Sequence, residues 1–439
     1  MLTREENEAL VRVGRGTQMG ELFRLFWMPC FPGPKLLRDG QPTPVRILGE
    51  DLILFRDSAG KPGLVANSCP HRGAPLMFGR NEDCGLRCVY HGWKFDVTGA
   101  PVDMPAESPR SRMSQRVRLL AYRCLERNGI IWCYMGPDQD NPPPLPNMEW
   151  NLVPGENVHV SFRVQECNWL QAAEGEIDSS HAAILHGRID NAGASSEWLA
   201  KKDLQPTFEC ITQPFGMSIA SRRKLDDNTL YWRVNQFILP FWTLVPPQSK
   251  YPELSGHAWV PIDDEHTLCL MFSYTPSGTL YPRSRELFEQ GYQGRETGHP
   301  SHQAFVSKPF GTPYADFWTK YSLETGYLFD YESQQTRMFS GLPGLWVQDS
   351  ACQSGVSPIF DRTKEHLSGG DTGIVMTRRL LLETLRSLRE RGIKPAGVED
   401  PDCSMIRALS LRLPSDVPWT QVGGEYMRAN LGSGFGYTP

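Results

Sequence analysis

Two short segments of the chain each carry one cysteine and one histidine, and they constrain the fold more than any other feature. The segments are Cys69-Pro70-His71 and Cys88-Val89-Tyr90-His91, with sixteen residues between His71 and Cys88. A [2Fe–2S] cluster with two thiolates on one iron and two imidazoles on the other requires this set of ligands. Glycine and proline beside the ligands let backbone N–H groups approach the sulfides. The pattern therefore predicts two loops that meet at one iron–sulfur cluster.

A zinc site is the alternative for these four residues. Zinc modules usually place two cysteines in one loop and two histidines in the next. Here each loop contributes one residue of each kind, and this mixed arrangement favours the cluster over zinc.

Strand-like runs separated by glycine and proline turns surround the two motifs. They cover residues 45–48, 52–55, 64–66, 122–125 and 130–134. A proline-rich stretch at 142–146 is typical of a stiff connector between domains. We therefore predict an all-β iron–sulfur domain over residues 27–145.

The remaining residues, 1–26 and 146–439, are predicted to form one larger α+β domain. Helical patterns cover 9–28, 168–186 and an amphipathic stretch at 374–388, and strand-like runs cover 207–224, 229–245, 256–261 and 266–275. This order predicts a central antiparallel sheet followed by C-terminal helices.

A second group of metal-ligand residue types follows the connector: Asp178, His181 and His186. Asp178 and His181 are three residues apart, so they share one face of a helix. His186 points about 140° away from His181 on an ideal helix, and both imidazoles reach one ion only where the helix widens or ends. We therefore predict a distortion at 182–187, where Gly187 is a natural stop. Two histidines and one carboxylate leave open positions on Fe(II) for O2 and a substrate.

The carboxylate that completes this group is less constrained. Four acidic residues of the C-terminal third are candidates: Asp349, Asp361, Glu365 and Asp371. Spacing does not choose among them, and the alternative for each is a solvated surface carboxylate.

Together the motifs resemble those of the Rieske non-haem iron ring-hydroxylating oxygenases. The similarity covers Cys-Pro-His-Arg-Gly-Ala-Pro-Leu at 69–76, Cys-x-Tyr-His-Gly-Trp-x-Phe at 88–95, and Asp-x-x-His-x(4)-His at 178–186 with the upstream Asn168. The resemblance implies a Rieske [2Fe–2S] cluster on Cys69, His71, Cys88 and His91, and one mononuclear Fe(II) on His181, His186 and Asp349. It also implies catalytic roles for Asp178 and Asn168.

The resemblance further implies how electrons reach the iron. Asp178 would link His181 to His91 of an adjacent subunit, so the enzyme would be a homo-oligomer, either a trimer or a pair of stacked trimers. A separate flavin and iron–sulfur reductase that oxidises NADH would be the electron donor.

The chain length and the stretch at 361–367 resemble the phthalate dioxygenase branch of this family. That branch implies O2-dependent cis-dihydroxylation of an aromatic carboxylic acid, with phthalate converted to cis-4,5-dihydroxy-4,5-dihydrophthalate. A carboxylate substrate needs cationic or hydroxyl donors inside an apolar pocket. The candidates are Ser179, Arg188, Arg222 and Arg233.

Other functions compete with this one. An aryl-ether mono-oxygenase or an O-demethylase of the same family would use the same two sites. A non-catalytic Rieske electron carrier would need only the first domain and would leave His181 and His186 unexplained. A zinc-stabilised binding protein is the remaining alternative, and analysis of iron and sulfide would distinguish it.

Charge and hydropathy limit the kinds of partner and the location that we expect for the chain. The net charge of -5 argues against a nucleic-acid or anionic-membrane partner. No run approaches the roughly 18 apolar residues that cross a bilayer, and the first residues lack the pattern of a secretion signal. The 11 cysteines are an odd number spread along the chain, unlike a secreted disulfide framework. We therefore expect a cytoplasmic protein.

Overall fold

Two large β-sheets organise the molecule. A computed structural model describes residues 1–439 except 109, 191–198, 248–252, 290–303 and 432–439. The first sheet has the order β1-β10-β9-β4-β3-β2, and all its strands but β1 overlap the predicted runs. Its strands are β1 Trp27–Pro32, β2 Thr43–Ile47, β3 Glu50–Arg56, β4 Pro62–Ala66, β9 Ala121–Arg127 and β10 Ile130–Tyr134.

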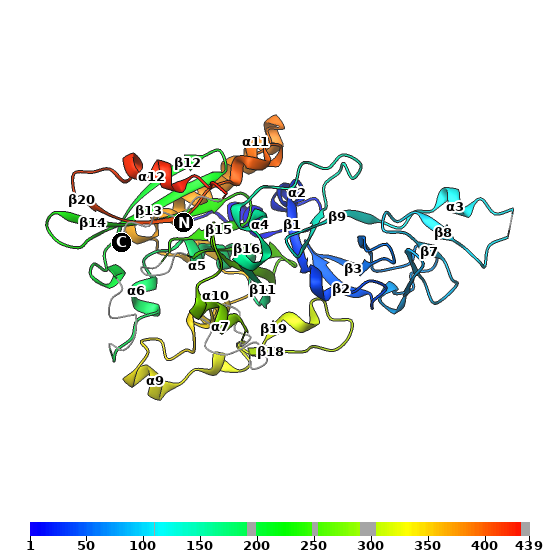
Figure 1. The fold of residues 1–439 in the computed structure, drawn as a ribbon, viewed down its shortest axis with the longest axis horizontal. Helices are drawn as coiled ribbons and strands as arrows, with labels where there is room; N and C mark the ends of the chain where they lie inside the picture. Colours follow the sequence, from blue (N-terminus) through cyan, green and yellow to red (C-terminus); the bar gives the residue numbers. More distant parts are fainter. Residues whose placement is uncertain (109, 191–198, 248–252, 290–303, 432–439) are drawn as a thin grey trace.

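A smaller sheet of four short strands, in the order β5-β6-β7-β8, completes the N-terminal domain. The strands are β5 Arg80–Glu82, β6 Gly85–Arg87, β7 Lys94–Phe95 and β8 Pro101–Asp103. Its own apolar core includes Leu76, Leu86 and Phe95. Figure 1 shows β7, β8 and helix α3 (Met113–Arg116) at one end of the molecule, so the Cys–His segments lie on a separate, projecting lobe.

The larger domain contains an eight-stranded antiparallel sheet, which confirms the predicted α+β architecture. Its order is β11-β17-β16-β15-β14-β13-β12, and β20 also pairs with β14. The predicted runs 207–224 and 229–245 each divide into two strands. The strands are β11 Val158–Gln165, β12 Thr207–Gln213, β13 Gly216–Lys224, β14 Thr229–Ile238, β15 Trp242–Val245, β16 Leu254–Pro261, β17 Thr267–Tyr274 and β20 Leu409–Pro414.

The two faces of this sheet differ in chemistry. Residues directly opposite one another on neighbouring strands share a face, as do residues two apart on one strand. The strand register therefore places seven buried or half-buried side chains on one face, here called the polar face: Arg163, Ser221, Arg223, Arg233, Asn235, Thr243 and His257. On the opposite face, Trp242 and Phe272 pack with Trp132 and Trp150. One continuous apolar core thus joins the two domains.

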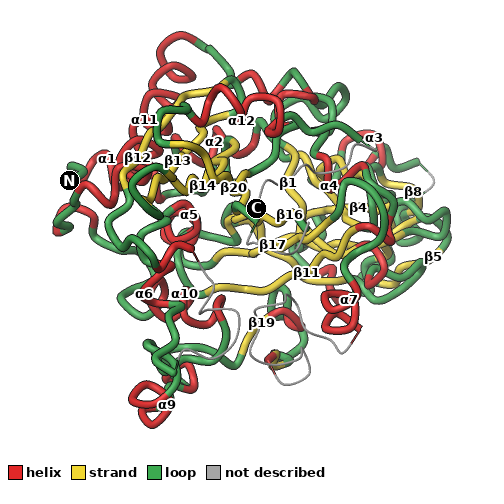
Figure 2. Tube along the Cα trace, turned by 60° about the vertical axis from the view of Figure 1, so that its left-hand side comes forward, coloured by secondary structure: helices red, strands yellow, loops and turns green. Residues whose placement is uncertain are grey.

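Two helices lie over the polar face. Helix α5 (Trp169–Ile177) contacts β14, β15 and β16, and α10 (Leu345–Ser354) packs against α5. Gly175 permits this packing, because a Cβ there would lie 1.9 Å from Nε2 of Gln353. Figure 2 shows α10 towards the β11 edge of the sheet and α11 towards the β12 edge. The other helices and short strands are α1 Arg4–Val11, α2 Gln18–Arg24, α4 Glu149–Leu152, α6 Ala182–Leu185, α7 Pro282–Glu289, α9 Tyr331–Thr336, α11 Thr372–Arg391, α12 Trp419–Met427, β18 Phe305–Val306 and β19 Trp318–Thr319.

Two of the predicted helices are interrupted. The prediction of one helix over 9–28 is wrong, because a Thr3–Glu6 capping box starts α1 earlier, and Gly14 and Gly16 separate α1 from α2. Gly16 has φ +82°, which glycine adopts without strain. The helix expected over 168–186 is divided at 178–181. In the part of the chain that the structure describes, no helix is long and apolar enough to span a bilayer.

A buried ion-pair network holds α5 in place. Glu174 accepts hydrogen bonds from Arg362 at 3.0 Å and from Arg378 at 2.6 Å, and Arg378 also pairs with Glu365. Burial alone would raise the pKa of Glu174, but the two guanidinium groups hold it below its ordinary value. Arg362 and Glu365 belong to the stretch at 361–367, so that stretch stabilises the helix that leads into the predicted iron ligands.

We predict that Glu174→Gln lowers the free energy of unfolding by about 3–5 kcal/mol, because two buried arginines lose their shared carboxylate. Urea unfolding measures the effect. Glu399→Gln is the matched control, because Glu399 is 76% exposed and its ion pair with Lys394 lies on the surface, and its effect is expected to stay within about 0.5 kcal/mol. A change below about 1 kcal/mol in Glu174→Gln would contradict the structural role of the network.

Candidate metal centres

The two Cys–His segments form loops with the same backbone pattern. Cys69 and Cys88 each donate a backbone hydrogen bond to the carbonyl five residues later, at 2.9 and 2.8 Å. Gly73 and Gly92 donate back to the carbonyl of the cysteine in their own loop, at 2.9 and 3.0 Å. Their φ angles are +73° and +75°, a region that favours glycine. The first loop follows β4 and the second joins β6 to β7, so both lie in the projecting lobe.

The side chains of these loops fit an iron–sulfur cluster. The rings of His71 and His91 lie 4.5 Å apart, and His71 stacks on Trp93 at 4.4 Å. Nδ1 of His71 is buried and has no hydrogen-bond partner within the described part of the chain. Burial raises the pKa of the Cys69 thiol to about 11, so this thiol ionises near neutral pH only beside a metal cation. An unpaired imidazole nitrogen and buried thiols match the ligands of a [2Fe–2S] cluster with two cysteines and two histidines.

The second group of ligand types converges from two helices. Nε2 of His181 lies 3.3 Å from Oδ1 of Asp349, and Nε2 of His186 lies 3.4 Å from the same oxygen. One nitrogen or oxygen atom from each of the three residues lies within 4.8 Å of the others. Asp349 comes from α10, whereas the two histidines flank α6. This is the arrangement of two imidazoles and one carboxylate that suits Fe(II) with open coordination positions.

The chain reaches this geometry by leaving the helix twice. Helix α5 ends at Ile177, and Asp178 has an extended backbone with φ -77° and ψ 110°. Helix α6 then has four residues, and His186 ends it with φ -90° and ψ 8°. The predicted distortion at 182–187 is confirmed at its C-terminal end, whereas the break at 178–181 was not predicted. Asp178 and His181 therefore meet across a turn and not on one helix face.

Hydrogen bonds fix the orientation of both imidazoles. Nδ1 of His181 bonds to Oδ2 of Asp178 at 3.2 Å, and Nδ1 of His186 bonds to Oε1 of Gln348 at 2.7 Å. Gln348 is fully buried and donates its amide N–H to the Leu342 carbonyl at 3.0 Å, so its oxygen faces the imidazole. Nδ1–H donation to both acceptors directs the Nε2 atoms of the neutral imidazoles towards a metal.

The charges of the site call for a cation. Burial alone would lower the pKa of His181, but its bonds with Asp178 and Asp349 raise it to about 10. Burial alone would raise the pKa of Asp349, but His181 and His186 hold it below its ordinary value, with a smaller effect of Arg163. Without a metal, a proton therefore occupies this position, and a divalent iron would replace it.

The other acidic candidates lie elsewhere. Asp361 accepts the Thr363 N–H at 3.1 Å and starts a short helical turn. Glu365 pairs with Arg378, and Asp371 accepts the Ser368 N–H at 2.7 Å. Among these four residues, only Asp349 meets the two histidines.

Asn168 occupies a structural position. It is fully buried, caps the N-terminus of α5 by accepting the Leu170 N–H at 3.1 Å, and donates to the carbonyls of Val11 at 2.9 Å and Asp264 at 2.7 Å. These three bonds engage both the oxygen and the nitrogen of its side-chain amide with backbone groups. The structure thus links Asn168 to the start of α5 and not to the histidines, which is at odds with a direct catalytic contact.

Ser179 lies beside two buried arginines on the polar face. Arg223 donates to Oγ and to the carbonyl of Ser179, at 3.1 and 2.5 Å. Burial, with a smaller effect of Arg233, lowers the pKa of Arg223 to about 10. Nε of Arg223 and both Nε and Nη1 of Arg233 are buried without a hydrogen-bond partner in the described residues. Arg223 was missed by the sequence analysis, because nothing in the sequence shows which of two adjacent arginines faces inward.

Two other predicted arginines lie outside this group. Arg222 points to the opposite face from Arg223, donates to Thr207 at 3.1 Å and lies 5.7 Å from the ring of Trp232. Arg188 pairs with Asp190 at 2.5 Å. The structure contradicts the prediction for Arg222, because strand residues one apart face opposite sides of a sheet. The carboxylate of Asp190 neutralises the charge of Arg188.

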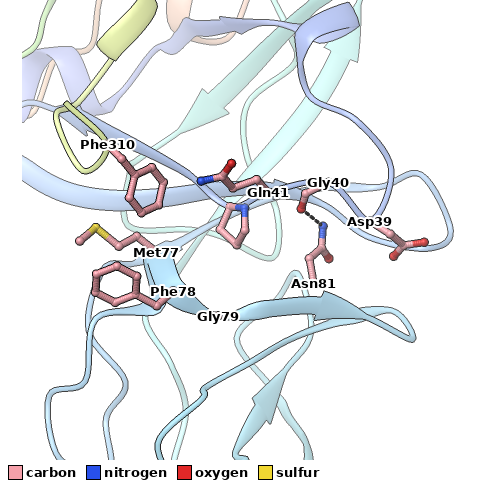
Figure 3. Close-up of a pocket in the computed structure, with 9 residues that line it drawn as sticks. Asp39, Gly40, Gln41, Met77, Phe78, Gly79, Asn81 and Phe310 are labelled. Atoms are coloured by element: carbon pink, nitrogen blue, oxygen red, sulfur yellow. Dashed lines mark hydrogen bonds between the residues drawn. The ribbon is translucent and has the colours of Figure 1, made fainter. Parts of the chain in front are cut away.

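A surface pocket of about 380 Å³ lies apart from both centres. Figure 3 shows Met77, Phe78 and Phe310 at one side of it, and Asn81, which donates to the Gly40 carbonyl at 3.0 Å, at the other. None of the predicted ligands lines it, so it is not part of the metal centres.

Comparison with known proteins agrees with this architecture. Residues 27–123 match the Rieske [2Fe-2S] domain, and residues 133–435 match the family described as LigXa C-terminal domain like. A domain for the cluster joined to a larger domain with a candidate mononuclear site defines the oxygenase components of two-centre iron enzymes. The chain belongs to the Rieske non-haem iron ring-hydroxylating oxygenases, whose cofactors are a [2Fe–2S] cluster and a mononuclear iron.

Several relatives place the chain within this family. It is 36% identical to the 3-chlorobenzoate-3,4-dioxygenase oxygenase subunit of Comamonas testosteroni, over 92% of this chain and 93% of the relative. It is 33% identical to the phthalate 4,5-dioxygenase oxygenase subunit of Pseudomonas putida, over 98% and 96%. Its fold is similar to that of dicamba monooxygenase bound to 3,6-dichlorosalicylic acid, with a TM-score of 0.57 at 16% identity over 84% of this chain and 99% of that one.

We predict that Gln348→Leu lowers the affinity for the mononuclear iron about 10- to 100-fold, because His186 loses the acceptor that fixes its tautomer. Iron titration of metal-depleted protein measures the affinity, and the visible spectrum of the cluster serves as an internal reference. Gln348→Glu keeps an acceptor oxygen and should retain most of the affinity. Equal iron affinity in Gln348→Leu and the wild type would exclude this orienting role.

Proposed function

We propose that the chain catalyses O2-dependent cis-dihydroxylation of an aromatic carboxylic acid, with phthalate as the substrate and an NADH-dependent flavin and iron–sulfur reductase as the electron donor. The observation that carries the proposal is the meeting of His181, His186 and Asp349 above a sheet face that carries buried cations. The relatives at 36% and 33% identity are named for chlorobenzoate and phthalate dioxygenases, which supports an aromatic acid.

Each metal group would be held by residues already described. Cys69, Cys88, His71 and His91 would hold the cluster, and His181, His186 and Asp349 would hold the mononuclear iron. When bound, the cluster supplies electrons and the iron supplies the position at which O2 is reduced. The residues around them orient the ligands: Asp178 and Gln348 keep the Nε2 atoms of the two histidines directed at Asp349.

Buried cations on the polar face would bind the acid. Arg233 and Ser179 are our first candidates, because Arg233 is 5% exposed and two of its nitrogens have no partner in the described residues. A carboxylate is the acceptor that suits a buried guanidinium. Arg223 already donates two bonds to Ser179, so it would position the segment that carries Asp178.

Asp178 would connect the two metal centres between subunits of a homo-oligomer, a trimer or two stacked trimers. Its Oδ2 bonds to His181 at 3.2 Å and its Oδ1 accepts the Ser180 N–H at 2.7 Å. The tip of the second cluster loop, with Val89 57% exposed and Tyr90 55% exposed, offers an apolar surface beside His91. A neighbouring subunit that covers this tip would bring His91 towards Asp178.

An aryl-ether mono-oxygenase or O-demethylase reaction is the alternative, because the chain is also 31% identical to the 5,5'-dehydrodivanillate O-demethylase oxygenase subunit of Sphingobium sp., over 91% of this chain and 84% of the relative. We predict that incubation with phthalate, reductase, NADH and ¹⁸O-labelled O2 gives a dihydrodiol that carries both labelled atoms. Mass spectrometry of the product decides, with benzoate and 3-chlorobenzoate in parallel and dimethyl phthalate as a neutral control. A product with a single labelled oxygen would support the alternative, and consumption of NADH without any product would count against both.

We predict that Asp178→Asn reduces coupled turnover about 100-fold, because the link between the centres loses its charged acceptor, while both metal groups stay largely bound. Product formation per NADH and metal content measure these two effects separately. Asp227→Asn is the matched control, since Asp227 is 95% exposed and pairs with Lys224 on the surface. Wild-type turnover in Asp178→Asn would refute the connecting role.

A further inference from the structure

Two buried N–H donors on neighbouring elements lack an acceptor. Arg163 on β11 is 5% exposed, and its Nε has no hydrogen-bond partner in the described residues. Nε1 of Trp346 on α10 is likewise buried without a partner there. A buried donor left without an acceptor costs free energy, and the cost is larger for a charged group. Neither residue is among the predicted site residues.

The two donors lie together beside the candidate iron site. The guanidinium carbon of Arg163 is 5.0 Å from the centre of the Trp346 ring. Trp346 precedes Asp349 by three residues on α10, so the two side chains share one face of that helix. Arg163 is also close enough for its charge to act on Asp349.

Arg163 has no carboxylate of its own in this region. Asp349 is engaged by His181 at 3.3 Å and by His186 at 3.4 Å, and its charge would be shared with the iron. The residue opposite Arg163 on β17 is Cys269, and burial raises the pKa of this thiol to about 12 despite the nearby guanidinium. A neutral thiol is a weak acceptor. The guanidinium therefore lacks an anionic partner that the described protein could supply.

We propose that Arg163 and the indole N–H of Trp346 form a subsite for an anionic oxygen, and that the carboxylate of the aromatic acid occupies it beside Asp349. The presence of a carboxylate ligand rests on the proposed function, whereas the pair of donors does not. Arg163 would supply the positive charge and a hydrogen-bond donor, and Trp346 would supply a neutral N–H donor and a ring against the guanidinium.

This subsite is distinct from the one around Arg233. Strand β14 lies four strands from β11 in the sheet, which is about 19 Å at the usual strand spacing. The two carboxylates of phthalate stand on adjacent ring carbons, so the Arg163 subsite and the Arg233 group are alternative positions for the acid, which the variants below distinguish. Arg163 lies 5.0 Å from the ring of Trp346, which shares a face of α10 with the iron ligand Asp349, and for that reason we assign the carboxylate next to the iron to Arg163.

Binding measurements on the resting holoenzyme, without reductase, test the subsite. The dissociation constants of benzoate, phthalate and the neutral benzamide are measured by calorimetry and by ligand-induced shifts in melting temperature. The variants are Arg163→Met, Trp346→Phe, Arg233→Met and the matched control Arg222→Met, which removes an arginine that stacks on a tryptophan on the opposite face. Cluster absorbance and iron content confirm that each variant is folded and loaded.

Arg163→Met should weaken the two acids about tenfold or more and leave benzamide nearly unchanged, because a charged hydrogen bond is lost only for the acids. Trp346→Phe keeps the ring and should weaken the acids about threefold to tenfold. Arg222→Met should change none of the three ligands. Trp346→Phe also keeps the test decisive if Arg163→Met fails to fold.

Three results would overturn the subsite: unchanged acid binding in Arg163→Met, an equal loss for acid and amide, or a loss confined to Arg233→Met. Absence of carboxylate binding to the wild type would overturn it as well, and would indicate that only water satisfies the two donors. Binding of acids that depends on Arg163, without product in the presence of reductase and O2, would instead uphold the subsite and refute the proposed reaction.

Discussion

The two interruptions of the helix, after Ile177 and at His186, are the constraint on which the candidate iron site depends. An uninterrupted helix would direct His186 about 140° away from His181, and the two Nε2 atoms would not meet at Asp349. Three sets of contacts fix the end of the helix. Glu174 is anchored by Arg362 and Arg378, Glu176 accepts bonds from Thr243 and His257 at 2.6 and 2.5 Å, and Ser179 is held by Arg223. Each of them ties α5 or the turn after it to a different part of the domain.

The distribution of charge in the larger domain follows from this arrangement. One face of the eight-stranded sheet is apolar and carries the aromatic core shared with the N-terminal domain. The other face is buried beneath α5 and α10 yet carries arginines, a histidine and small polar side chains. Some of these groups have partners within the protein. In the part of the chain that the structure describes, Nε of Arg163, Arg223 and Arg233 and Nη1 of Arg233 have none. Buried cations without counter-ions destabilise a fold unless a ligand compensates them, and this is why we propose that an anionic substrate binds at this face.

The sequence predicted the local parts of the site and missed the contacts that come from distant segments. Cys69, His71, Cys88 and His91 lie in short motifs whose spacing alone indicates a cluster. His181 and His186 are five residues apart, and the need for both to reach one ion predicted a helix end. Asp349 is about 160 residues further along the chain, so only the family resemblance indicated it. Gln348, Arg163 and Trp346 were missed, because the sequence does not show that α10 and β11 bring their side chains together.

The arginines show most clearly the physical limit of prediction from a sequence. Arg222 and Arg223 are adjacent, and the period of two in a strand sends one to the polar face and the other to Trp232. A sequence shows that such a choice exists but not which residue faces the core, because that depends on the register with the neighbouring strand. The prediction chose Arg222, whereas the structure places Arg223 beside Ser179. Helix caps were equally hidden: Asn168 has the position expected of a family motif, and its hydrogen bonds show a structural role.

The most direct test of the account is the content of iron and acid-labile sulfide in the purified wild type and in Asp349→Ala, together with the electron paramagnetic resonance spectrum of each after reduction. With a [2Fe–2S] cluster and a separate iron at Asp349, the wild type contains iron in excess of the sulfide, Asp349→Ala loses only that excess, and both give the same cluster signal. A colourless protein that contains zinc and no sulfide, or an excess of iron that persists without Asp349, would contradict it.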